Sequence, residues 1–440
     1  MSPLRILAFD HFFDQDLDAL GDALKPGDSL DVVSYRRLHR LARRVFPDDA
    51  FTGVRRAYED DMDSAWQRYE AIAGEFASWM AAAYRPQVFV VPSDVFFYLR
   101  PVITRVRDLG VPTVVVQKET TISPMVMGRH ADEVGAVVPF MSDLMTVCSE
   151  RHREFWLRCG ADPEKVVVTG QPRFDVYRWD QRPERPGRPR LLYLSFDDVA
   201  YLPADLGDSD GASWRDLRRS TEEAIGAAAQ RWDVRAKLHP QQSVGDDWLG
   251  DLVTRVDRRA DTRRLIVDAD VVLGFQTTGL FEAALAGKPI IYPAWGPTFE
   301  RLRETLIPFD GYEGLVNHAR TPEELVLMLA SGLDESVTVS PSDVAREAVA
   351  EHLGPTDGKA SERVITLLRA SAGEPRVHRI RRMSIAWAIL KGGVGAAVLA
   401  MAAGVAAVGR GSLRCGLDRR AREYRQLRDE GLILSRIRSP

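Results

Sequence analysis

Residues 270–292 read DVVLGFQTTGLFEAALAGKPIIY, and this stretch decides the fold. An apolar run is followed by two threonines, an alanine-rich helical run and, after Gly-Lys-Pro, a second apolar run. Short Val- and Ile-rich runs are typical of parallel strands that are buried on both faces. The stretch therefore predicts a strand, a helix and a second parallel strand, which is the unit of an open α/β sheet.

The same alternation recurs along the chain before this stretch. Apolar runs expected as strands occupy residues 4–10, 30–35, 88–93, 113–117, 144–149, 166–169, 191–195 and 234–238. Residues 179–190, WDQRPERPGRPR, cannot continue a helix or a central strand because of their three prolines. We therefore predict two α/β domains, residues 1–182 and 183–373, joined by this linker. Ligands bind beyond the carboxyl ends of such strands, so we expect a site in a cleft between the domains.

Length and composition narrow the class of protein. The 440 residues suit two or three domains, and 45% hydrophobic with 28% charged residues indicates a folded chain. A net charge of −4 argues against a nucleic-acid partner. Three cysteines without a C-x-x-C pair, and an N-terminus without a long apolar core, predict a cytoplasmic protein without disulfides or a zinc site.

Residues 374–440 differ from the rest of the chain. They hold 14 Lys and Arg against 5 Asp and Glu, whereas residues 1–373 carry a net charge of −13. Within this tail, residues 392–408 are uncharged, rich in Ala and Gly, and flanked by basic segments on both sides. A single membrane crossing would put one basic flank outside. We therefore expect a helical tail held peripherally on the anionic inner face of the cell membrane, with a hairpin packed on the body as the alternative.

Two strand ends carry cationic groups that suit phosphate. In VTGQPRFD, residues 168–175, a Gly-x-Pro-Arg turn would present Arg173, whose guanidinium can bind a phosphate through two hydrogen bonds. The alternative is a structural turn in which Arg173 pairs with Asp175. In KLHP, Lys237 and His239 stand at the end of another strand, where they suit an anion or play a structural role.

The stretch at 270–292 offers a third anion site. Thr277 and Thr278 begin its helix, and the free N–H groups and hydroxyls of a helix start bind anions. Gly279 permits a close approach there, and Glu282, one turn further, is placed to accept ribose hydroxyls. The alternative is an ordinary helix cap.

Candidates for a general base follow two strands of the first half. Glu119 lies in the loop after the strand at 113–117, and Asp10 and His11 follow the first strand. An exposed pair of Lys118 with Glu119 is the alternative at the first place. Metal-binding and phosphate-loop motifs are absent from the sequence, and no G-x-G-x-x-G follows the first strand. We expect neither a metal nor a bound cofactor.

Four segments, taken in order, resemble the bacterial CDP-glycerol glycerophosphotransferases and related teichoic-acid-type surface-polysaccharide transferases. They are GQPRFD, KLHPQ, ADVVLGFQTTGLFEAALAGKPIIYP and DGKASER, within about residues 110–370. The resemblance implies the GT-B architecture, with two Rossmann-like domains facing a central cleft and the donor held in the C-terminal one. It also implies that His239, Thr277 and Thr278 hold the donor pyrophosphate, Glu282 its ribose, and Arg173 the phosphate side of the cleft.

One departure from that family concerns the base. Teichoic-acid members have Trp-His-Gly after a strand of the N-terminal domain, and residues 117–119 here read Gln-Lys-Glu. A carboxylate at Glu119 suits deprotonation of a sugar hydroxyl.

These residues together predict a function. We expect a metal-independent transferase that moves a sugar or polyol phosphate from a nucleotide-activated donor, which is a substrate, to a lipid-linked surface-glycan acceptor. In such a reaction helix N-termini, Arg and His meet the charge on the leaving pyrophosphate. One alternative is a nucleotide-sugar 2-epimerase of the same architecture, although the matching place, residues 117–119, lacks its His-x-Glu. The other is a membrane-recruited nucleotide-binding protein without turnover.

Overall fold

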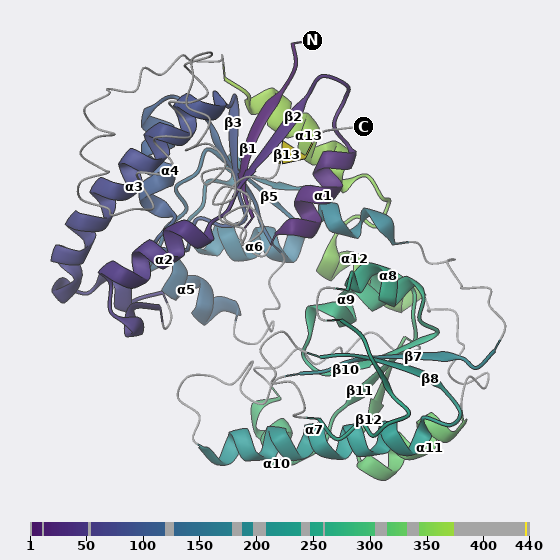
Figure 1. Cartoon of the computed structure of the whole chain (residues 1–440). Coiled ribbons are helices and arrows are strands. Elements are labelled where there is room, and N and C mark those ends of the chain that lie inside the picture. The colour runs from purple at the N-terminus through teal and green to yellow at the C-terminus, as the bar shows by residue number, and fades with distance from the viewer. Residues whose placement is uncertain are drawn as a thin grey trace, which may run out of the picture.

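The strands of the computed structural model gather in two sheets, and each sheet is the centre of one α/β domain in Figure 1. The structure describes residues 2–10, 13–51, 54–118, 127–177, 187–196, 208–238, 247–257, 260–303, 315–331, 343–373 and 436–437.

The first sheet has the strand order β13-β2-β1-β3-β4-β5-β6. Its strands are β1 (Arg5–Phe9), β2 (Ser29–Val33), β3 (Val88–Val91), β4 (Thr113–Val116), β5 (Leu144–Val147), β6 (Val166–Val168) and β13 (Arg436–Ile437). All pairs are parallel except that of β13 with β2. The expected strands of the first half are confirmed. Phe89 and Val91 of β3 join the core on one face and Val88 and Val90 the core on the other, which explains the unbroken apolar run.

The helices of the first half are α1 (Asp14–Asp22), α2 (Arg36–Val45), α3 (Asp63–Tyr84), α4 (Arg100–Asp108), α5 (Met127–Val137) and α6 (Glu150–Arg158). Short 3₁₀ turns are η1 (Asp48–Phe51), η2 (Arg56–Tyr58), η3 (Asp60–Met62), η4 (Pro163–Lys165) and η5 (Pro172–Val176). The core on one sheet face receives side chains from α2 to α6, and the core on the other receives them from α1.

The second sheet has the order β12-β11-β10-β7-β8-β9, with every pair parallel. Its strands are β7 (Arg190–Leu194), β8 (Asp233–Lys237), β9 (Thr254–Arg255), β10 (Val271–Gly274), β11 (Ile290–Pro293) and β12 (Val316–Ala319). Its helices are α7 (Asp208–Ala228), α8 (Thr262–Val267), α9 (Thr278–Leu285), α10 (Pro297–Leu302) and α11 (Pro322–Ser331). The strand, helix and strand expected at 270–292 are β10, α9 and β11, so that prediction is confirmed.

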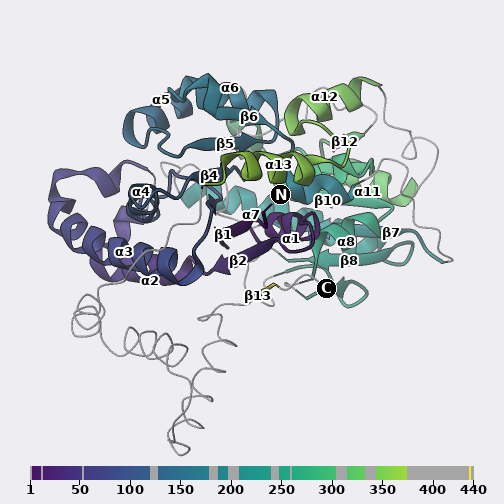
Figure 2. The same ribbon diagram turned by 90° about the horizontal axis from the view of Figure 1, so that it is seen from above.

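The last two helices with described positions lead the chain back to the first sheet. After α12 (Asp343–Leu353), which contacts both α6 and α9, α13 (Ala360–Ser371) buries Val364 and Leu368 in the core that contains β1. Figure 1 shows α13 beside β1 and β2, and Figure 2 shows it from above. The side chains of Arg369 and Asp28 form an ion pair that fastens this end. The end of the expected second domain, residues 183–373, thus packs on the first sheet.

The expected membrane tail lies outside the described residues, apart from the two-residue strand β13. Among the helices with described positions, none combines the length and apolarity needed to cross a membrane.

Candidate functional site

The two domains meet through segments that follow the carboxyl ends of their strands. From the first sheet come α1, after β1, and η5, after β6; from the second come α9, after β10, and the residues around α8. Arg173 of η5 contacts Glu282 of α9, and Asp18 of α1 lies 3.8 Å from Arg263 of α8. This junction is where open α/β sheets bind ligands.

The predicted site residues divide into two groups. The structure brings Arg173, Lys237 and Glu282 to the junction, and places Thr277, Thr278 and Gly279 at the start of α9. His11, Glu119 and His239 lie outside the described residues.

Arg173 and Glu282 form a buried ion pair between the domains. Nη2 of Arg173 lies 3.6 Å from Oε1 of Glu282, and the two side chains are 6% and 5% exposed. The hydroxyl of Tyr177 donates a hydrogen bond to the other carboxylate oxygen of Glu282. Burial and the neighbouring Glu282 carboxylate raise the pKa of Tyr177, so this hydroxyl keeps its proton. Glu282 is therefore held from two sides rather than turned to solvent.

Asp16 of α1 holds the turn that carries Arg173. Its buried Oδ1 accepts hydrogen bonds from Nε2 of Gln171 at 2.6 Å and from the backbone N–H of Arg173 at 3.1 Å. The guanidinium of Arg173 also lies over the ring of Phe174, 5.0 Å from its centroid. Contacts within the first domain thus fix the position of Arg173.

Asp175, the alternative partner considered for Arg173, fastens another element. The carboxylate of Asp175 accepts the backbone N–H groups of Ala360 at 2.8 Å and Ser361 at 2.7 Å. These N–H groups have no partner within α13, because they open that helix, and a carboxylate there also meets the positive end of the helix dipole. Asp175 therefore fastens α13, while Arg173 contacts Glu282 at the junction.

Two of the motifs recognised in the sequence interlock at this point. Arg363 donates from Nε to the carbonyl of Thr169 at 2.8 Å and forms two hydrogen bonds with Asp357, at 2.8 and 3.0 Å. Gly170 has a φ of +78°, and a Cβ there would lie 3.2 Å from both the Cβ of Ala360 and the carbonyl oxygen of Pro355. The glycine of GQPRFD thus gives room to the DGKASER segment.

The start of α9 has the features of an anion site. Thr277 is the N-cap residue, and its side chain accepts the N–H of Gly279 at 3.4 Å, which leaves its own hydroxyl proton to donate. Thr278 is the first helical residue and is half-buried. Gln276 has a left-handed φ of 45°, an uncommon conformation outside glycine that often marks functional turns, and its Nε2 donates to the Tyr292 hydroxyl at 2.6 Å.

Gly279 has a packing role at the start of α9. A Cβ at this position would lie 2.5 Å from Cδ1 of Leu194, the last residue of β7. The close approach that Gly279 permits is therefore between α9 and the neighbouring strand. Tight packing here fixes the helix start relative to the carboxyl end of β7.

Lys237 brings a second cation to the same region. It ends β8, and its Nζ donates a hydrogen bond to the carbonyl of Ala260. Burial lowers the pKa of Lys237, while Asp261, Glu282 and Asp257 act in the opposite direction. Glu282 is thus one of the carboxylates that favour the charged form of Lys237.

Asp10 lies at the carboxyl end of β1, where the sequence predicted a possible base. Its Oδ1 accepts the backbone N–H of Tyr35 at 2.8 Å, which ties it to the start of α2. Burial, followed by the carboxylates of Asp10 and Asp18, raises the pKa of Asp14 in the next turn. This edge of the first domain therefore concentrates negative charge.

The junction also holds polar residues that were not predicted, among them Asp16, Tyr177 and Gln276. Asp16 had a signal, because it stands on the apolar stripe of α1 with Leu17 and Leu20, all three of them buried. Tyr177 and Gln276 had none, since neither residue type nor spacing sets them apart.

No family model and no curated protein matches the sequence. Solved structures match the fold. A protein from Listeria monocytogenes assigned as a UDP-N-acetylglucosamine 2-epimerase has a TM-score of 0.50 and 15% identity, over 84% of this chain and 96% of that one. The wall teichoic acid polymerase TagF, soaked with CDPG, has a TM-score of 0.52 and 10% identity, over 83% and 88%. The chain has the GT-B fold. At such identities the likeness establishes the fold, so the GT-B expectation is confirmed and the reaction must be argued from the site.

Proposed function

We propose that this GT-B protein is a metal-independent transferase that moves a sugar or polyol phosphate from a nucleotide-activated donor to a lipid-linked surface-glycan acceptor. The donor is a substrate, and the protein needs no bound cofactor. The narrower resemblance to glycerophosphotransferases and the structural likeness to TagF support this choice of reaction.

The observation that carries the proposal is the position of Arg173. It is oriented by Asp16 of α1 and reaches the second domain at Glu282, in the second turn of α9. Lys237 and the helix start at Thr277 and Thr278 add further positive potential in the second domain. A diphosphate at this junction would meet a guanidinium, an ammonium, the threonine hydroxyls and the positive end of the α9 dipole, which are groups that stabilise a leaving group in the absence of a metal.

The proposed reaction is a displacement at the donor. The acceptor hydroxyl oxygen forms a bond to the anomeric carbon or, for a polyol phosphate, to the phosphorus. The bond from that atom to the nucleotide leaving group breaks with its electron pair, and a base takes the hydroxyl proton. We propose Glu119 as this base, with Asp10 and His11 as the next candidates, and Glu282 as a partner for the ribose.

A 2-epimerase is the second candidate, and the likeness to the Listeria protein favours it. An epimerase changes the donor alone, whereas a transferase needs an acceptor and releases the nucleotide part. The two reactions are therefore separated by their products.

The test is a panel of nucleotide sugars and CDP-polyols, first scored by the increase in melting temperature of the protein. Donors that stabilise it are then incubated with and without lipid-linked acceptors, and the products are followed by mass spectrometry and proton NMR. We expect a mass gain on the acceptor and release of the nucleotide. An epimerised donor without acceptor would favour the second candidate, and stabilisation without turnover would favour the binding protein.

A lipid-linked acceptor requires the protein to work at a membrane. We propose that the tail holds the protein in the cytoplasm on the inner face of the membrane, where lipid-linked acceptors are extended.

A further inference from the structure

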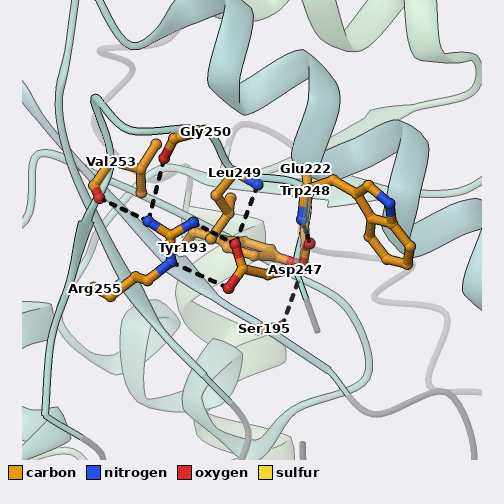
Figure 3. Close-up of polar contacts among 9 residues, drawn as sticks. All are labelled: Tyr193, Ser195, Glu222, Asp247, Trp248, Leu249, Gly250, Val253 and Arg255. Atoms are coloured by element: carbon orange, nitrogen blue, oxygen red, sulfur yellow. Dashed lines mark hydrogen bonds and ion pairs between the residues drawn. The ribbon is translucent and has the colours of Figure 1, made fainter. Parts of the chain in front are cut away.

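A buried carboxyl group lies behind the donor side of the second domain. Glu222 of α7 is 0% exposed, and both its oxygens are engaged (Figure 3). Oε1 accepts the hydroxyls of Tyr193 at 3.0 Å and Ser195 at 3.3 Å, and Oε2 accepts the backbone N–H of Trp248 at 2.8 Å. One side chain thus joins α7, the end of β7 and the segment that leads to β9.

These partners connect Glu222 to the proposed donor groups. Ser195 is the first residue beyond β7, and its backbone N–H donates to the carbonyl of Lys237 at 3.0 Å. The next residue, Phe196, packs against the ring of Phe275, with 5.1 Å between centroids, two residues before Thr277. Glu222 therefore lies a short chain of contacts away from both Lys237 and the start of α9.

The charged groups around Glu222 come from three elements. Arg218, one turn earlier on α7, lies over the Trp248 ring at 5.1 Å. Asp247 faces Glu222 from the adjoining segment and is held by Arg255, with 3.1 Å between Nε and Oδ2. Burial, as the largest effect, raises the pKa of Glu222 to about 7, with Asp247 in the same direction and Arg218 and the hydrogen bonds from Trp248 and Tyr193 opposing it. Its protonation state therefore changes near neutral pH.

We propose that Glu222 is a proton-sensitive positioning residue, which in its ionised form fixes the carboxyl ends of β7 and β8 for binding of the donor phosphates. The ionised carboxylate accepts three hydrogen bonds. When Glu222 is protonated, the oxygen that carries the proton becomes a donor, and at least one of these three bonds weakens. The inference rests on the proposed function, because it concerns the site at which the nucleotide donor would bind.

The first experiment measures the affinity for UDP-N-acetylglucosamine and CDP-glycerol between pH 5.5 and 8.5. Their phosphodiesters do not titrate in this range, so a change reports the protein. For the donor that binds, we expect a dissociation constant that rises at least threefold as pH falls through about 7.

The Glu222→Gln variant should bind this donor weakly at every pH. Its KM should be higher than that of the unmodified protein, and its kcat should stay within about twofold. Glu223→Gln, an exposed neighbour on the same helix, is the matched control and should behave like the unmodified protein. If the Glu222→Gln variant keeps the donor affinity and the pH profile of the unmodified protein, the proposal is overturned.

A second readout does not depend on the donor. The fluorescence of Trp248, obtained as the difference from Trp248→Phe, should titrate with a midpoint near pH 7, and this transition should be absent in Glu222→Gln and present in Glu223→Gln. Ser195→Ala, which removes one bond to the ionised form, should move the midpoint to higher pH, and it provides the test if Glu222→Gln does not fold. If the fluorescence of Trp248 does not change with pH, the proton-sensitive role of Glu222 is overturned. A clear titration without binding of any nucleotide refutes the proposed function and the positioning role, and leaves Glu222 as a structural anchor.

Discussion

The guanidinium of Arg173 lies 3.6 Å from the carboxylate of Glu282, and the two residues belong to different domains. Both were expected to touch a bound donor, Arg173 at its phosphates and Glu282 at its ribose. In the structure they contact each other, and Tyr177 donates a hydrogen bond to the same carboxylate. Donor binding by Glu282 would therefore require a rearrangement of this pair. Alternatively, the intact pair would line the donor site.

This pair changes what is expected of a substitution at Arg173. Arg173→Met leaves the Glu282 carboxylate buried without its ion-pair partner, and the free energy of unfolding should fall by about 3–5 kcal/mol. Combining Arg173→Met with Glu282→Gln should recover a clear part of that loss, because no isolated charge remains. Urea unfolding of the single and double variants measures the coupling. A single-variant loss below about 1 kcal/mol would show that Arg173 is not tied to the fold.

Gly279→Ala tests the packing of α9 on β7. Its Cβ would lie 2.5 Å from Cδ1 of Leu194, so we expect a loss of about 1–3 kcal/mol in stability from overpacking. Leu194→Ala removes the opposing atom, and the double variant should be more stable than the sum of the single losses by about 0.5–3 kcal/mol. Thermal or urea unfolding gives this difference. Strict additivity would contradict the contact.

The hydroxyls at the start of α9 give a prediction about binding. Thr277→Val combined with Thr278→Val should weaken donor affinity by about 1–3 kcal/mol, because two hydrogen-bond donors are lost while the shape of the side chains is kept. Calorimetry with the donor that stabilises the protein most is the measurement. The control, Thr277→Ser with Thr278→Ser, keeps both hydroxyls and should bind almost as well. Equal affinity in the Val and Ser variants would exclude the hydroxyls from the site.

Glu119→Gln tests the first candidate for the base. The substitution should leave donor affinity intact and lower turnover by about 10²–10⁴, the factor that a positioned base supplies. Steady-state rates of nucleotide release measure it, with Asp10→Asn and His11→Gln in parallel. Near-normal turnover in Glu119→Gln, with a large loss in one of the others, would move the role to that residue.

The tail gives a prediction about location. The full chain should sediment with anionic liposomes at low salt and be released by high salt, because its basic flanks bind anionic headgroups. A chain ending at residue 373 should remain in the supernatant, and neutral liposomes serve as the control. Full-length protein that stays in the supernatant under all conditions would refute membrane attachment.

The sheet-forming part of the fold was predictable from local sequence. Strands buried on both faces require unbroken apolar runs, such as residues 88–91 and 113–116, and these were recognised. A Thr-x-x-Glu spacing such as that of Thr321 and Glu324 is typical of a helix start, and the N–H of Glu324 donates to the Thr321 hydroxyl at 3.1 Å. Such local rules need no knowledge of the partner segments.

The junction was predictable only in part, because its contacts join residues far apart in the chain. The residue type of Arg173 suggested an exposed phosphate ligand, and nothing local indicated that Glu282, more than a hundred residues later, would face it. The same holds for Asp175, whose partners are the first N–H groups of α13. Strands β9 and β12 were not predicted, for a different reason. β9 has two residues and β12 reads VNHA, so neither shows an apolar run.

The central claim is transfer from a nucleotide-activated donor, and product analysis tests it most directly. The full chain is incubated with the donor that stabilises it, with a lipid-linked glycan acceptor and a metal chelator, and mass spectrometry follows both substrates. We expect an acceptor heavier by one sugar or one polyol phosphate, together with an equal amount of released nucleotide. An unchanged acceptor beside an epimerised donor, or no turnover with any donor that binds, would contradict it.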